Sequence, residues 1–169
     1  NAIVVADVTA LGGWSGIALD TYEPRTYINP TYFATLGHGF PTAMGAKIAF
    51  PERAVVDISG DGAFLFNSQE LETACRYGIS IVALVIDDCG FGTIKELQKE
   101  QYGRCKGHTF NNPDWLELAE AYGAQGFVAE ELEDVPAVIE KALSLPGPSI
   151  VVAKHDTLPS YALNALPRH

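Results

Sequence analysis

Two acidic turns, each placed directly after a run of strand-forming residues, constrain this chain most. Residues 54–59 form a short apolar, β-branched run that leads into a Gly-Asp-Gly turn centred on Asp61, and residues 79–86 lead into an Asp-Asp-Cys-Gly turn that contains Asp88. Between them, residues 69–77 carry apolar side chains at helical spacing. This order predicts a βαβ unit with parallel strands and a right-handed crossover. Both aspartates then fall at carboxyl ends of neighbouring strands, where open α/β sheets bind ligands.

The chemistry of these two turns suits a metal-bound diphosphate. Asp61 and Asp88 provide hard oxygen ligands, and Mg²⁺ is usually held by one or two carboxylates together with phosphate oxygens of a ligand. The glycines beside Asp61 allow a sharp turn and a close approach of phosphate oxygens. The tripeptide alone also fits a simple tight turn between strand and helix, so the βαβ context is what favours a magnesium-diphosphate site.

The remaining chain alternates strand and helix patterns without repeats. We expect further strands at residues 3–6, 127–128 and 149–153, helices that include residues 44–49, 114–122 and 135–145, and a glycine-containing loop at residues 11–14. Asn111 or Asn112 is the expected cap of the helix at 114–122. This alternation predicts an α/β fold: a doubly wound, mainly parallel sheet of about six strands with helices on both faces. We expect one domain over residues 1–156 and a tail or arm at residues 157–169.

Composition narrows the possible partners and compartments. The chain has 169 residues, 47% of them hydrophobic, which is enough for one well-buried core. A formal charge of −10 argues against nucleic acid or an anionic membrane as partner, although solubility alone also explains it. The three cysteines are an odd number without metal-site spacing, so we expect reduced thiols and a cytoplasmic location. Neither a membrane-spanning apolar stretch nor a signal-peptide pattern is present in the sequence.

The same residues resemble the enzymes that depend on thiamine diphosphate (ThDP), within them the acetolactate synthase and 2-oxo acid decarboxylase group. The family motif begins with Gly-Asp-Gly and ends in a pair of asparagines. Residues 60–64 and 69–74 match it nearly position by position, and residues 36–46 are similar to the segment that lies under the cofactor. The resemblance covers residues 2–152 and identifies the C-terminal, diphosphate-binding domain of such an enzyme.

This resemblance implies roles for individual residues. Asp61, Asp88 and the backbone carbonyl of Gly90 would ligate Mg²⁺. Leu36 would prop ThDP into its bent conformation, and the carbonyl of Ala34 would face the aminopyrimidine. The diphosphate would lie against the glycine turn and the start of the next helix, at Gly60, Gly62, Ala63, Gly90, Phe91 and Gly92.

The resemblance also implies an activity and its missing parts. The parent enzyme would be a decarboxylase or carboligase (a lyase or a transferase) that acts on a 2-oxo acid. The glutamate that activates the cofactor lies in a separate pyrimidine-binding domain of such enzymes, so we expect this chain alone to be inactive and to act in a dimer or larger homo- or hetero-oligomer. That partner would cover an exposed apolar face. The alternative is a non-catalytic regulatory or assembly domain of the same fold that binds a diphosphate or nucleotide.

Some positions depart from the family pattern or allow two interpretations. The family has asparagine where this chain has Asp88, and acetolactate synthases tend to have tryptophan at the position of Leu97 and a Gln-His pair at residues 10–11. His38 fits either a substrate-positioning role or a structural hydrogen bond. The apolar side chains of residues 91–97, Leu97 among them, would face either the substrate or a neighbouring domain.

Overall fold

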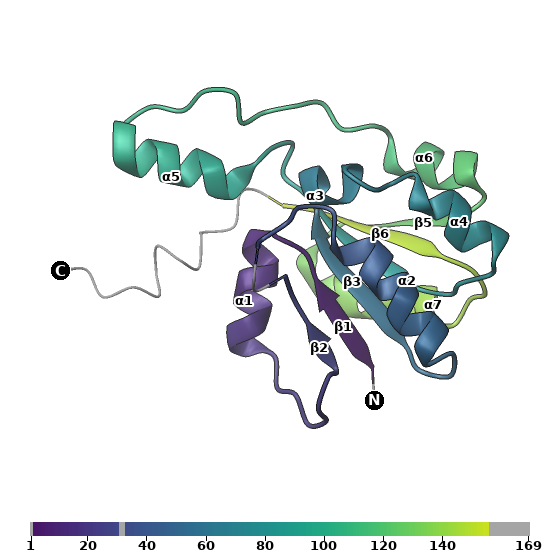
Figure 1. Cartoon of the computed structure of the whole chain (residues 1–169). Coiled ribbons are helices and arrows are strands. Elements are labelled where there is room, and N and C mark those ends of the chain that lie inside the picture. Colours follow the sequence, from purple (N-terminus) through teal and green to yellow (C-terminus); the bar gives the residue numbers. More distant parts are fainter. Residues whose placement is uncertain (1, 31–32, 156–169) are drawn as a thin grey trace.

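A computed structural model describes residues 2–30 and 33–155 of the chain; the tail predicted at residues 157–169 lies outside these ranges. One six-stranded, all-parallel sheet has the order β2-β1-β3-β4-β6-β5 (Figure 1). Its strands are β1 (Ile3–Ala6), β2 (Tyr27–Ile28), β3 (Val55–Gly60), β4 (Val82–Asp87), β5 (Gln125–Ala129) and β6 (Ser149–Lys154). The predicted fold class is therefore confirmed.

Helices cover both faces of the sheet, so the molecule has three layers. They are α1 (Ala10–Ala18), α2 (Gly39–Ala49), α3 (Asp61–Leu65), α4 (Glu70–Arg76), α5 (Gly92–Tyr102), α6 (Trp115–Tyr122) and α7 (Val135–Leu143), with a 3₁₀ turn, η1 (Leu132–Asp134). One core cluster contains residues of α2, α3, α4 and α6, and the other is packed by α1 and α7. The connections that run along the sheet toward β5 therefore place their helices on one face, and the connections that run toward β2 place theirs on the other face. This arrangement follows if every crossover between parallel strands is right-handed.

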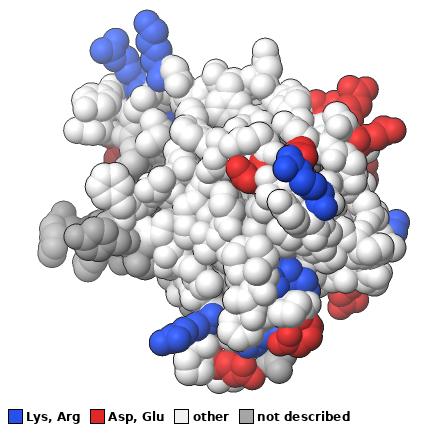
Figure 2. Space-filling model, turned by 45° about the vertical axis from the view of Figure 1, so that its right-hand side comes forward, with Lys and Arg blue, Asp and Glu red and all other residues white. Residues whose placement is uncertain are grey.

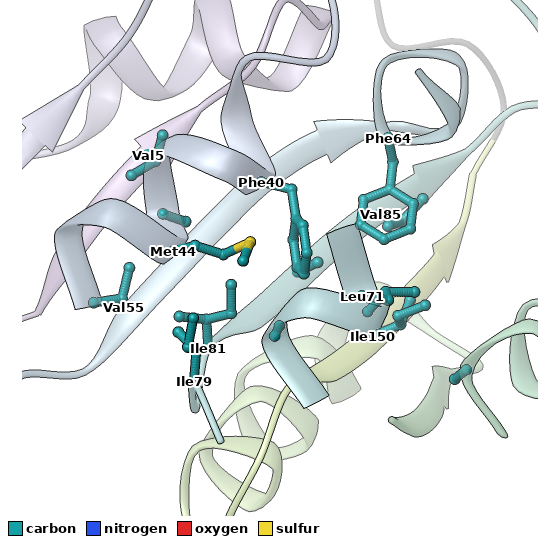
Figure 3. Packing of buried hydrophobic residues seen from close by; sticks show 14 of the residues in the cluster. Val5, Phe40, Met44, Val55, Phe64, Leu71, Ile79, Ile81, Val85 and Ile150 are labelled. Carbon is teal, nitrogen blue, oxygen red and sulfur yellow. The ribbon is translucent and has the colours of Figure 1, made fainter. Parts of the chain in front are cut away.

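The two core clusters take alternate residues of the central strands. In β4, Ala83 and Val85 belong to the first cluster, whereas Leu84 and Ile86 belong to the second. Figure 3 shows the first cluster, in which Phe64 and other helix side chains lie over the strands. Phe64 is 1% exposed and follows Asp61 by one helical turn, so its burial, which contributes about 1.5–3 kcal/mol, also fixes the Gly-Asp-Gly turn.

Two local predictions need correction, and two elements were missed. Residues 11–14, expected as a loop, lie in α1, where the small glycines allow close packing: a Cβ on Gly12 would meet the carbonyl oxygen of Asp7 at 2.3 Å. The cap of α6 is Asp114, which accepts bonds from the amides of Leu116 and Glu117, and neither Asn111 nor Asn112 caps it. Strand β2 and the short helix α3 were not predicted.

Helix α5 packs least closely of the described helices. None of its residues is buried, and Figure 1 shows it projecting from the body of the domain. Ile94, Leu97 and Tyr102 on this helix are among the exposed large apolar side chains. On the face shown in Figure 2, charged side chains are few and scattered over a largely uncharged surface. Across residues 2–30 and 33–155, none of the helices is long and apolar enough to cross a membrane.

Candidate functional site

A cavity of about 240 Å³ lies at the carboxyl ends of β1, β3 and β4. After β1 the chain moves to β2 at one edge of the sheet, and after β3 it moves the opposite way to β4, which makes this a topological switch point. The cavity is lined by Val8, Thr9, Ala10, Leu36, Gly60, Asp61, Gly62, Ala63, Ile86, Asp88, Gly90, Phe91, Gly92, Thr93 and Ile94. Most of the predicted site residues therefore meet in one place.

Asp61 is the most buried acidic group of this cavity, with 1% of its surface exposed. Its Oδ1 accepts a bond from the amide of Gly62 (2.6 Å), and its Oδ2 accepts from the amide of Gly90 (3.2 Å) and from Asn112 Nδ2 (2.7 Å). Burial raises the pKa of Asp61 above its usual value, and these hydrogen bonds oppose the rise. A carboxylate has room for further partners on both oxygens, so the bonds leave it able to ligate a cation.

Asp87, which was not predicted as a site residue, anchors the other acidic turn. Its Oδ2 accepts from Trp115 Nε1 (2.8 Å), and its Oδ1 accepts from Asn112 Nδ2 (2.6 Å) and from the amide of Cys89 (3.3 Å). Burial acts to raise the pKa of Asp87, but the donors outweigh it, so the net pKa lies below the ordinary value. Asp87 is thus held as a carboxylate by its surroundings.

Asp88 occupies the rim between two hollows, and Gly90 lines the first of them. Asp88 lines the cavity described above and also a broad open cleft of about 1300 Å³ on the other side of the turn. Within residues 2–30 and 33–155, no three His, Cys, Asp or Glu side chains are grouped to hold a metal ion. A magnesium site here would instead use the two carboxylates of Asp61 and Asp88, the Gly90 carbonyl and phosphate oxygens, as this ion commonly does.

Two aromatic rings pack closely against the Gly-Asp-Gly turn at Gly62. A Cβ on Gly62 would lie 2.6 Å from Phe91 Cε1 and 3.1 Å from Phe110 Cζ, and these two rings pack edge to face with centroids 5.0 Å apart. The amide of Phe91 donates to the carbonyl of His108 at 2.7 Å. A diphosphate at this position would therefore rely on the amides beside Phe91 or displace that bond.

Asp7 ties the Leu36 segment to the end of β1. Its carboxylate accepts from the amides of Gly37 (3.2 Å) and Gly39 (2.6 Å), while Asn67 Nδ2 donates to the Gly37 carbonyl at 2.6 Å. These bonds hold Leu36 half-buried at the cavity wall. Asp7 was not recognised from the sequence, although a polar residue directly after a strand is a usable signal.

Three of the predicted site residues lie away from the cavity lining. Ala34 is exposed and has a left-handed backbone (φ 50°). His38 shares a 2.9 Å hydrogen bond with Thr42 Oγ1 through Nδ1, a contact that fits the structural interpretation, and its Nε2 is buried without a hydrogen-bond partner among the described residues. Leu97 is 40% exposed and does not line the cavity, unlike Phe91 and Ile94.

Comparisons with known proteins agree with this geometry. The family described as thiamine pyrophosphate enzyme, C-terminal TPP binding domain, matches residues 7–153. A probable acetolactate synthase large subunit from Methanococcus aeolicus is 32% identical over 169 residues, covering 99% of this chain and 28% of that protein. Acetolactate synthase from Bacillus subtilis is 34% identical over 151 residues, covering 89% of this chain and 26% of that protein. The chain thus spans roughly a quarter of the length of these relatives.

Proposed function

The chain belongs to the thiamine pyrophosphate enzyme family as its C-terminal TPP-binding domain, and from this premise we propose that it anchors ThDP through Mg²⁺ in an acetolactate synthase-like decarboxylase or carboligase. Membership implies ThDP with Mg²⁺ as cofactors. The observation that carries the proposal is the meeting of Asp61 and Asp88 in one cavity at the switch point of the sheet.

The residues present fit this cofactor. Asp61, Asp88 and the Gly90 carbonyl would hold the metal, and the diphosphate would lie against the cavity wall at Gly62 and Gly92. Leu36 would support the bent cofactor from below. When bound, ThDP supplies a carbon nucleophile for breaking or forming a bond next to a carbonyl group. The contribution of this chain is to bind and orient that cofactor and to exclude water from the apolar wall formed by Leu36, Phe91 and Ile94.

We assign the rest of the reaction to parts outside this chain. Activation of the cofactor would need the glutamate of a pyrimidine-binding domain or subunit in an oligomer, and a 2-oxo acid would be the substrate. The exposed Ile94 and Leu97 of α5 support such a neighbour, because large apolar side chains at a surface are typical of contact sites.

The direct test is calorimetric titration of the protein with ThDP in Mg²⁺ and again in a chelator. We expect binding that requires the metal and that weakens by more than about tenfold in Asp61→Asn, since even changes around a metal ligand cost that much. Asp20→Asn, the same change at an exposed position, is the matched control. Binding that is equal with and without chelator would refute the magnesium site. Metal-dependent binding without 2-oxo acid turnover, in an assembly that contains a pyrimidine domain, would favour the non-catalytic alternative.

Asp88→Asn is expected to raise the affinity for ThDP in Mg²⁺ several-fold. Asp88 places a second carboxylate near an anionic diphosphate, and the amide keeps an oxygen ligand while removing that repulsion. Calorimetry of the two proteins at one Mg²⁺ concentration measures the effect. An unchanged or lower affinity would show that the ion already neutralises the second charge or that the charge itself holds the ion.

A further inference from the structure

We propose that Asn112 is a positioning residue of the metal site: its amide clamps Asp61 and Asp87 together and so sets the spacing of the two turns that supply the metal ligands. This inference rests on the proposed function. Its starting point is that Asn112 Nδ2 lies 2.7 Å from Asp61 Oδ2 and 2.6 Å from Asp87 Oδ1. One NH₂ group therefore donates to two carboxylates, one at the start of α3 directly after β3 and one at the end of β4.

The bridge acts on the turns after β3 and β4 directly. Asp61 Oδ2, which accepts from Asn112, also accepts from the amide of Gly90 at 3.2 Å. The same oxygen thus connects the side chain of the first expected ligand with the backbone of the second turn. A shift of Asn112 would change the separation between Asp61 and the loop that carries Asp88 and Gly90.

Charge explains why an amide stands between these groups. Neither Asp61 nor Asp87 forms an ion pair with any residue of the described ranges, and each is at most 9% exposed. Two buried carboxylates at one place repel each other unless donors separate them. The Asn112 NH₂ offers one hydrogen to each, and hydrogen bonds to charged acceptors of this kind are short and strong.

The orientation of the Asn112 amide leaves its oxygen without a hydrogen bond among the described residues. Both carboxylates are pure acceptors, so Nδ2 must face them. Asn112 Oδ1 is then buried without a partner in the described part of the chain, which is unfavourable because the oxygen has lost its hydrogen bonds to water. Buried polar atoms rarely lack partners, and such exceptions often mark functional sites. The carboxylates therefore dictate how this side chain lies.

Asn112 is held in place from the α6 side. Trp115 is 5% exposed, packs against Phe64 with ring centroids 6.0 Å apart, and donates to Asp87 Oδ2 at 2.8 Å. Asp114 caps α6 between them. The clamp thus connects the metal turns to the hydrophobic core, and it suits an aspartate at position 87, because an asparagine there would turn an NH₂ toward another donor.

The test compares Asn112→Leu with Asn111→Leu, the same change at the exposed neighbouring asparagine. We measure the affinity of each protein for Mn²⁺ with ThDP by electron paramagnetic resonance and for Mg²⁺ with ThDP by calorimetry. We expect Asn112→Leu to lose about 10–100-fold in metal-dependent affinity, as for other residues that orient ligands. Excess metal should restore its binding, and Asn111→Leu should bind as the unmodified protein does.

Circular dichroism at the same temperature establishes that the variants are folded, and Asn112→Ser, which adds no volume to the site, replaces Asn112→Leu if the latter unfolds. If the role of Asn112 is purely structural, its substitution will lower the free energy of unfolding but leave the metal affinity of the folded protein unchanged. That result would overturn this inference and leave the proposed function standing. If the unmodified protein shows no metal-dependent binding, the proposed function fails and the inference fails with it.

Discussion

Asp57→Asn is expected to remove a steep pH dependence from the free energy of unfolding. Asp57 lies within β3, is 0% exposed, and has a pKa of about 8 because burial, opposed by a hydrogen bond from Ser59 and assisted by the nearby carboxylate of Asp7, raises it from 3.8. Within residues 2–30 and 33–155, its Oδ1 is buried without a hydrogen-bond partner. These facts describe an acid that the folded protein keeps protonated at neutral pH.

The sign of the effect follows from proton linkage. Between the unfolded value of 3.8 and the folded value of about 8, the folded state holds one more proton than the unfolded state. The stabilising contribution of this proton is complete below the lower pKa, declines by about 1.4 kcal/mol per pH unit, and is lost once the pH passes the upper pKa. The unmodified protein should therefore unfold in less urea as the pH rises through this window.

Asparagine reproduces the neutral side chain at every pH. Its Oδ1 can keep the bond from Ser59, and its NH₂ would replace the unpartnered oxygen beside Asp7. Urea titrations of both proteins at several pH values between 5 and 8, a range inside the window set by the Asp57 pKa, measure the difference. We expect the two proteins to diverge as the pH rises, with the variant more stable at the upper end. Parallel pH profiles would mean that Asp57 does not titrate in this range.

The sequence predicted the βαβ unit around Asp61 because its strands are buried on both faces and therefore read as continuous apolar runs. It did not predict β2, whose two residues are too few to form a pattern. It also assigned residues 11–14 to a loop, since glycines disfavour helices when no packing is known. In the structure, helix α1 passes so close to the Asp7 carbonyl oxygen that a Cβ on Gly12 would lie 2.3 Å from it. Glycine is therefore needed at this position of the helix because of packing.

At the site, motif and spacing predicted the residues of the two turns but not the residues that hold them. Asn112 is 51 positions from Asp61 and 25 from Asp87, so their contacts depend on how α6 returns across the sheet. Asp57 was passed over as one polar residue in an apolar strand. An acid in the middle of a buried run is itself a signal, because such a group must be neutralised or paired.

Gly39→Ala is expected to destabilise the protein by about 3 kcal/mol, at the upper end of overpacking effects. A Cβ on Gly39 would lie 2.2 Å from Asp57 Oδ1 and 2.9 Å from Asp7 Oδ2, and neither side chain can withdraw because both are buried. The Gly39 amide also donates to Asp7 at 2.6 Å, so a displaced backbone would move the Leu36 segment. We therefore expect weaker ThDP binding as well as lower stability.

Gly45→Ala is the matched control, because Gly45 lies in the same helix, is exposed, and has nothing within 4 Å of the added Cβ. Alanine there should stabilise the protein by about 1 kcal/mol through helix propensity. Urea unfolding of the two variants therefore gives changes of opposite sign, and their difference isolates the close contact at Gly39 from the general effect of replacing glycine. If Gly39→Ala is as stable as Gly45→Ala and binds ThDP as the unmodified protein does, then Asp7 and Asp57 do not enclose this turn. The Leu36 segment would in that case owe its position to Asn67 and the neighbouring backbone.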